Sequence, residues 1–108
     1  MVKKLNRFDI VLVKLNPTVG SEIQKTRPCI VISPDEMKAL KTVIIAPMTS
    51  KGFSFVFRPH IHFKKKDGLV SLDQIRTVDK TKIIKKIGTV DEKTSKEIAE
   101  TLQEMFRY

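Results

Sequence analysis

Apolar residues in the first half of the chain occur in short runs between turn-forming residues, and the runs are rich in β-branched side chains. Such runs predict β-strands, because branched side chains pack well on a pleated surface. Residues 35–40 have the composition of one short helical turn. The predicted strands are residues 8–15, 28–33 and 42–46, which end at Asn16-Pro17, Pro34 and Pro47 respectively.

The second half contains further predicted strands. Phenylalanine recurs at every second position over residues 53–57, and this period of two predicts a half-buried strand. Residues 60–63 extend that strand beyond Pro59. Residues 64–68 combine three lysines with Asp and Gly, which predicts a charged hairpin tip. The remaining predicted strands are residues 68–72 and a run within residues 82–90.

The last segment is helical in pattern. Its apolar residues fall at i, i+4, i+7 and i+8, which is one face of an amphipathic helix, and they are Ile98, Leu102, Met105 and Phe106. Asp91 or Thr94 is the candidate N-cap, and Thr94 with Glu97 fits a capping box. We therefore predict one domain over residues 1–108, mainly β with a C-terminal helix. A small, closed or strongly curved antiparallel sheet is the natural way to bury such short strands.

Charge is the strongest signal in the composition. The 108 residues include 21 Lys and Arg against 12 Asp and Glu, a formal net charge of +9. Such an imbalance in a small domain favours a polyanionic partner: nucleic acid, an anionic membrane surface or an acidic protein. A generally basic surface without a specific partner is the alternative. The hydrophobic share of 41% excludes a disordered chain.

The single cysteine, Cys29, lies in an apolar run, so we predict that it packs as a small hydrophobic residue rather than acting as a nucleophile. One cysteine excludes an internal disulfide. With no signal peptide or membrane-length apolar run, the predicted compartment is the cytoplasm. His60 and His62 point the same way on a strand, but no Cys or carboxylate cluster accompanies them, and we predict no metal site or cofactor.

Two short motifs follow or precede predicted strands and carry candidate chemistry. Arg27-Pro28 places a permanently charged guanidinium, whose rigid fork of donors suits phosphate, at the start of a buried strand. Thr49-Ser50 places two hydroxyls at a strand end, where they can donate to a phosphate. The alternatives are an Arg on a surface turn and a hydroxyl that merely closes a turn.

A second polar concentration occupies residues 72–80. Gln74 can hydrogen-bond the edge of a base, and Arg76 can pair with phosphate or with Asp79. The alternative is a structural Asp–Arg pair that stabilises the strand exit. If this segment stays extended, Asp73 and Gln74 face opposite sides.

Together these motifs resemble the MazF/PemK-like endoribonuclease toxins of bacterial type II toxin–antitoxin modules. The resemblance covers essentially the whole chain, and the motifs that carry it are residues 16–22, Thr26-Arg27-Pro28, Val31-Ile32-Ser33, residues 47–50 and residues 72–80. It implies a small SH3-like β-barrel of the MazF/CcdB type that forms a homodimer. It also implies metal-independent cleavage of single-stranded RNA, including mRNA, at a preferred sequence. The implied products are a 2′,3′-cyclic phosphate and a 5′-hydroxyl, and the implied partner is an acidic antitoxin that occupies the RNA groove.

The resemblance also assigns roles to residues. Arg27 and Thr49 match the catalytic pair of the family, and Asp73 matches an acid proposed as a base in one branch. That branch pairs the acid with an Arg two residues earlier, where this chain has Ser71. Other members have Gln and Gly where this loop has Ile23 and Lys25. The predicted RNA-binding residues are Ser21, Glu22, Lys25, Ser50, Gln74 and Arg76.

The chemistry of the residues constrains those roles. Arg27 has too high a pKa to act readily as a base, so we expect it to stabilise charge on the phosphoryl oxygens. Asp73 or Glu22 is the easier base for the 2′-hydroxyl. Two other functions fit the same pattern. One is a gyrase-inhibiting toxin of the same fold, against which the Arg27–Thr49 pair argues, and the other is a non-catalytic nucleic-acid-binding module.

Overall fold

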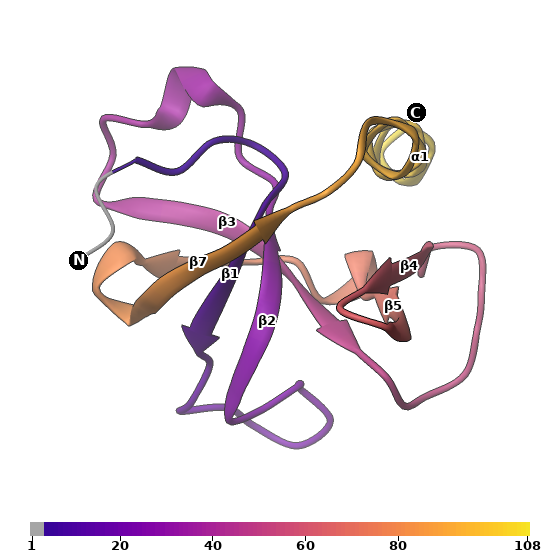
Figure 1. The fold of residues 1–108 in the computed structure, drawn as a ribbon, viewed down its shortest axis with the longest axis horizontal. Coiled ribbons are helices and arrows are strands. Elements are labelled where there is room, and N and C mark those ends of the chain that lie inside the picture. Colours follow the sequence, from indigo (N-terminus) through magenta and orange to yellow (C-terminus); the bar gives the residue numbers. More distant parts are fainter. Residues whose placement is uncertain (1–3) are drawn as a thin grey trace.

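The computed structural model describes residues 4–108, which form an antiparallel β-barrel with one α-helix beside it (Figure 1). Three short 3-10 helices, η1 to η3, connect some of the strands. The elements are β1 (Asp9–Lys14), β2 (Thr26–Val31), η1 (Asp35–Met37), β3 (Thr42–Thr49), β4 (His60–Phe63), β5 (Lys66–Val70), η2 (Leu72–Gln74), β6 (Arg76–Asp79), η3 (Lys80–Lys82), β7 (Ile83–Thr89) and α1 (Glu92–Met105).

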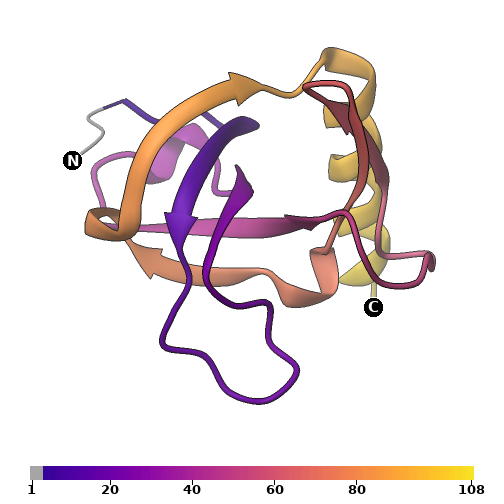
Figure 2. The ribbon, with the colours of Figure 1, turned by 60° about the horizontal axis from the view of Figure 1, so that its bottom comes forward.

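The strands form one curved sheet in the order β4-β5-β3-β2-β1-β7, and β6 pairs with β3 beside this path. Figure 2 shows how the sheet curls round, while the long β1–β2 loop projects away from the barrel. The two ends of the path meet through Phe63 of β4 and Gly88 of β7. A Cβ at Gly88 would lie 2.6 Å from Cε1 of the Phe63 ring, so this close approach requires a glycine. The predicted small, strongly curved antiparallel barrel is therefore confirmed.

The central strands are buried on both faces. In β2, Cys29 and Val31 join a cluster inside the barrel, whereas Ile30 joins a second cluster beneath α1. In β1, Val11 belongs to the cluster inside the barrel and Ile10 to the cluster beneath α1. Burial on both faces explains why these strands read as continuous apolar runs instead of an alternating pattern.

Helix α1 covers the second cluster with the face that the sequence predicted. Ile98 and Leu102 are buried there, and the Asp91 carboxylate accepts a hydrogen bond from the Thr94 N–H at 2.7 Å as the N-cap. Of the two N-cap candidates, the structure thus has Asp91. Phe106 was predicted on the buried face, and this prediction is wrong. It lies just past the helix end with an exposed fraction of 68%, because the backbone leaves the helical conformation there.

Three strand predictions need correction. Residues 53–57 form a loop instead of a strand, because the Arg58 N–H bonds to the Phe55 carbonyl in a turn and Pro59 has no N–H for a ladder. β3 continues through Pro47 to Thr49, since the missing N–H there does not prevent the Pro47 carbonyl from accepting the Ser71 N–H at 2.8 Å. The strand predicted at 68–72 ends at Val70, and η2 follows. No helix among the described residues is long and apolar enough to cross a membrane.

Candidate functional site

Arg27 and Thr49, predicted from separate motifs, line one cavity from two neighbouring strands. β2 and β3 pair with Cys29 opposite Pro47. Arg27 lies two residues before Cys29 in β2 and Thr49 two residues after Pro47 in β3, so both lie just beyond the same end of this ladder. Both residues, with Ser50, line one cavity of about 380 Å³. The pairing of the strands therefore assembles a guanidinium and hydroxyls at one point of the barrel.

The Arg27 guanidinium is exposed, and only one of its nitrogens is hydrogen-bonded among the described residues. Its Nε donates to the Gln24 carbonyl at 3.2 Å, which fixes the direction of the side chain. Within residues 4–108 its Nη groups make no hydrogen bond, so they remain available to an anion in the cavity. A guanidinium keeps its charge under ordinary conditions and presents its donors in a planar fork. This arrangement suits a phosphodiester.

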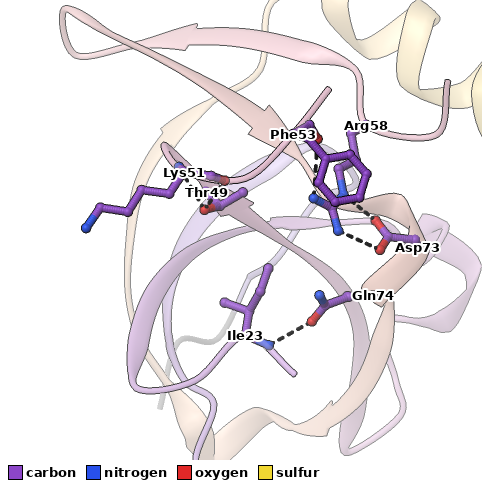
Figure 3. Close-up of polar contacts among 7 residues, drawn as sticks. All are labelled: Ile23, Thr49, Lys51, Phe53, Arg58, Asp73 and Gln74. Carbon is purple, nitrogen blue, oxygen red and sulfur yellow. Dashed lines mark hydrogen bonds and ion pairs between the residues drawn. The ribbon is translucent and has the colours of Figure 1, made fainter. Parts of the chain in front are cut away.

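The Thr49 hydroxyl closes a tight turn at the end of β3. It donates to the Lys51 carbonyl at 2.9 Å and accepts from the Lys51 N–H at 3.1 Å (Figure 3). The Thr49 hydroxyl therefore closes a turn, which is the alternative role that the sequence allowed for it. Because a hydroxyl has one proton, Thr49 must rotate away from the Lys51 carbonyl before it can donate to a phosphate oxygen.

The same cavity contains charged residues that the sequence did not assign to the site. Lys64 and Lys66, from the β4–β5 hairpin, line it, and the Lys64 ammonium lies 5.5 Å from the centroid of the Phe63 ring. The run of three lysines was visible in the sequence, but nothing local indicated that this hairpin folds back towards Arg27. The rest of the wall consists of Asp67, Gly68 and four apolar residues, namely Pro28, Met48, Phe63 and Ile87.

Most of the other predicted residues line a second cavity, of about 510 Å³. The β1–β2 loop and the segment that follows β5 form this cavity together. The structure thus places the predicted residues at two cavities. Met48 of β3 lines the first cavity, and the preceding residue, Pro47, lines the second. Lys25 lines neither cavity. The predicted residues in the second cavity are Ser21, Glu22, Asp73, Gln74 and Arg76.

Two of these side chains hold the β1–β2 loop in place. The Ile23 N–H donates to Gln74 Oε1 at 2.7 Å (Figure 3), so the Gln74 carbonyl oxygen anchors the loop. The Val19 N–H donates to Glu22 Oε1 at 2.6 Å. The loop that borders the second cavity is therefore ordered by contacts to its own carboxylate and to the segment after β5.

The Arg76 side chain also binds the backbone of the β1–β2 loop. Its Nη1 donates to the Leu15 carbonyl at 3.2 Å, whereas the carboxylate of Asp79 accepts from the Thr81 N–H at 2.9 Å. The suggested Arg76–Asp79 pair is therefore not formed. Lys25 adopts a left-handed backbone conformation, with φ of 70°, which favours glycine.

Asp73 has a partner that lies fifteen residues earlier in the chain. Arg58 Nε and Nη2 donate to the two carboxylate oxygens of Asp73, each at 3.0 Å. This bidentate contact raises the pKa of Arg58 above its ordinary value, chiefly through the hydrogen bond to Asp73. The guanidinium beside Asp73 is thus that of Arg58, and it does not come from the position two residues before the acid. Ser71, which occupies that position, is fully buried.

Cys29 is fully buried, and burial raises the pKa of its thiol to about 12. It packs as predicted and is not a nucleophile at neutral pH, because the thiolate is the reactive form. His62 Nδ1 lies 2.7 Å from the carboxylate of Asp67. In the described part of the chain, no three His, Cys, Asp or Glu side chains are placed to hold a metal ion.

The fold and the first cavity together define a small basic β-barrel with a site suited to a phosphate anion. The chain matches the family model described as PemK-like, MazF-like toxin of type II toxin-antitoxin system over residues 6–106, and it belongs to this family. A curated relative, the Endoribonuclease MazF of Staphylococcus saprophyticus, is 33% identical over 101 residues, which are 87% of this chain and 84% of the relative.

Solved structures share the fold at lower sequence identity. A crystal structure of MazF from Deinococcus radiodurans has a TM-score of 0.83 at 19% identity and covers 96% of this chain and 97% of its own. A mycobacterial endoribonuclease in complex with its cognate antitoxin has a TM-score of 0.78 at 16% identity, with coverage of 94% and 93% respectively. These similarities confirm the mainly β fold with a C-terminal helix.

Proposed function

We propose that this protein is an endoribonuclease toxin that cleaves single-stranded RNA, including mRNA, at a short preferred sequence. The observation that carries the proposal is that Arg27 and Thr49 line one cavity, together with Lys64 and Lys66. The family of the chain and the printed name of its curated relative support the same activity. An mRNA substrate implies action in the cytoplasm.

In the proposed reaction the RNA supplies its own nucleophile. The ribose 2′-hydroxyl loses its proton to a base, and its oxygen attacks the adjacent phosphorus. The bond to the 5′-oxygen breaks, that oxygen takes up a proton, and the products are a 2′,3′-cyclic phosphate and a 5′-hydroxyl. An internal nucleophile needs no metal-activated water, which is why we propose that the cleavage is independent of metal ions.

Arg27 and Thr49 bind the scissile phosphate in this scheme. The free Nη groups of Arg27 donate to the phosphoryl oxygens as negative charge develops and to the departing 5′-oxygen, and Thr49 adds a donor once its hydroxyl leaves Lys51. Ser50 and the hairpin lysines Lys64 and Lys66 attract the neighbouring phosphates.

Of the two acids that the sequence offers as the base, Glu22 is the one with a free oxygen. Both oxygens of Asp73 accept hydrogen bonds from Arg58, at 3.0 Å each. Glu22 uses one oxygen to bind the Val19 N–H and keeps the other without a partner among the described residues. We therefore propose Glu22 as the base and Asp73 as the anchor of Arg58. Under this proposal Glu22→Gln loses more cleavage than Asp73→Asn, and the reverse order would restore the catalytic role of Asp73.

The proposed partners follow from charge and family. A net charge of +9 favours an acidic antitoxin that covers the cavities, and a mycobacterial structure similar to this chain is a complex with a cognate antitoxin. We also propose that the chain acts as a homodimer, which light scattering of the purified protein tests directly.

The test is single-turnover cleavage of a mixed-sequence RNA in the presence of EDTA, with the ends of the products identified. Wild-type protein is expected to leave 5′-hydroxyl ends. Arg27→Ala and Thr49→Ala are each expected to slow cleavage by about 10²–10³-fold, the usual cost of one preorganised donor. Arg107→Ala and Thr42→Ala are matched controls at exposed positions away from the cavities. Binding without cleavage by wild-type protein would refute the proposed activity.

A further inference from the structure

The loop between β3 and β4 carries a large apolar side chain, Phe53, that is mostly exposed. Phe53 has an exposed fraction of 72%, whereas Phe55 and Phe57 in the same loop are half-buried. Single exposed apolar residues are common on proteins, so exposure alone has no functional meaning. The arrangement behind the ring is what distinguishes Phe53.

Arg58 supports the ring from behind. Its guanidinium carbon lies 5.2 Å from the centroid of the Phe53 ring and 4.8 Å from that of the Phe55 ring. The same guanidinium is fixed by its two bonds to Asp73, and its Nη1 also donates to the Phe53 carbonyl at 3.4 Å (Figure 3). The Arg58 side chain has an exposed fraction of only 13%. The Phe53 ring thus lies against a rigidly held cation and near the Phe55 ring, whose centroid is 5.7 Å away, and most of the Phe53 side chain remains exposed.

The backbone before the ring is shaped for this contact. Gly52 has φ of 103°, a conformation that other residues rarely adopt, and a Cβ there would lie 3.2 Å from Arg58 Nη1. The loop also begins at the turn that Thr49 closes with Lys51. Phe53 is therefore held four residues after the proposed catalytic Thr49, by an ion pair whose acid, Asp73, lines the second cavity.

We propose that Phe53 is a stacking platform for one unpaired nucleobase of the RNA, and that Arg58 is the positioning residue that holds the ring ready. The proposal rests on single-stranded RNA being the ligand, as proposed above. Stacking on an aromatic face accepts any base, and a cation behind the ring is compatible with the negative phosphates beside it. The excess of positive charge on the chain favours the same ligand.

The chain contains no tryptophan, so Phe53→Trp introduces a single fluorescent probe at the proposed platform. The ligand is a mixed-sequence 2′-O-methyl RNA, which lacks the 2′-hydroxyl and cannot be cleaved by the proposed reaction. We expect this RNA to quench the Trp fluorescence through stacking. Val56→Trp is the matched control, because Val56 is equally exposed in the same loop, at 73%, and is not stacked on Arg58. Equal quenching of both probes, or of neither, would overturn the proposal.

Affinity gives the second measurement. Phe53→Leu keeps an apolar side chain but loses the ring, and we expect it to bind the 2′-O-methyl RNA about 5- to 150-fold more weakly, whereas Phe53→Tyr restores binding. Arg58→Ala in the Phe53→Trp background is expected to reduce the quenching, and Arg58→Lys not to restore it, because an ammonium cannot hold both Asp73 oxygens and stack on the ring. Lys93→Ala is the control for the loss of one charge.

The two proposals fail separately. If wild-type protein cleaves RNA but Phe53→Leu binds as tightly as wild type, the platform is refuted and the endoribonuclease proposal stands. If wild-type protein does not cleave RNA but the Phe53→Trp probe is quenched, the platform stands and the activity is refuted. Denaturant unfolding of each variant verifies that it is folded under the binding conditions.

Discussion

The contact between Arg58 and Asp73 joins the β3–β4 loop to η2, and its strength can be measured as a coupling energy. Two charge-assisted hydrogen bonds of 3.0 Å link the side chains, which have exposed fractions of 13% and 29%. Exposed ion pairs contribute about 0.2–1 kcal/mol, and hydrogen bonds to charged groups about 1.5–3 kcal/mol. For this partly buried, bidentate geometry we expect a coupling free energy of about 1–2 kcal/mol.

A double-mutant cycle of Arg58→Ala and Asp73→Ala measures this coupling. Arg58→Ala is expected to be the more destabilising single change, because it also removes the cation–π contacts to Phe53 and Phe55, each of about 0.5–1 kcal/mol. The double variant is then expected to unfold at nearly the same urea concentration as Arg58→Ala. Urea is the suitable denaturant, because guanidinium chloride screens ion pairs.

The Arg107–Glu104 pair at the end of α1 provides a control cycle. Its side chains are also in contact, at 2.6 Å, but are 74% and 55% exposed, so its coupling is expected to stay below about 0.5 kcal/mol. A coupling for Arg58–Asp73 within the additivity error, below about 0.3–0.5 kcal/mol, would refute the view that this ion pair holds the loop.

Three further predictions concern the barrel, the β1–β2 loop and the helix cap. Gly88→Ala places a methyl group against the Phe63 ring and is expected to lower the free energy of unfolding by about 1–3 kcal/mol. Adding Phe63→Leu to this variant should recover part of the lost stability. If it recovers none, the ring is not the cause of the loss. Lys25→Gly is expected to stabilise the protein by about 1 kcal/mol relative to Lys25→Ala, because of the left-handed backbone there, and equal melting temperatures would contradict this. The N-cap bond to Thr94 lowers the pKa of Asp91 from its ordinary value of 3.8, so its stabilising contribution is complete above that value and is lost as the pH falls through the lowered pKa. Asp91→Asn keeps a capping oxygen without the charge, so the difference in melting temperature between wild type and variant should shrink in acid, and a difference constant down to about pH 2 would exclude the charge as its source.

The ion pair between Arg58 and Asp73 could not be predicted from the sequence. The sequence motifs indicated Arg76 as a partner for phosphate or for Asp79, and they indicated no partner for Asp73. Its actual partner comes from a loop that the alternating phenylalanines had indicated as a strand. No local pattern specifies a contact across fifteen residues, because it depends on the turn that Pro59 and the Arg58 N–H impose on the loop.

The position of the β4–β5 hairpin at the first cavity could not be predicted from local sequence either. Its lysines were visible as a charge run and a hairpin was predicted, but β5 begins at Lys66, inside the tip predicted at residues 64–68. The contact of the hairpin with β7 through Phe63 and Gly88 was not predicted, since a glycine near a strand end does not say which ring lies over it.

The sequence by itself determined the strands of the barrel core, the amphipathic face of α1 and the burial of Cys29, because these follow from local periodicity and residue chemistry. The resemblance of its motifs indicated the family, and it predicted Arg27 and Thr49 as candidate site residues. Only the tertiary structure decided that Arg27 and Thr49 line a cavity separate from that of Asp73, that Arg58 binds Asp73, and that Phe53 faces outward. Those relations depend on strand register and on loop contacts between distant segments, and no local pattern in the chain encodes either.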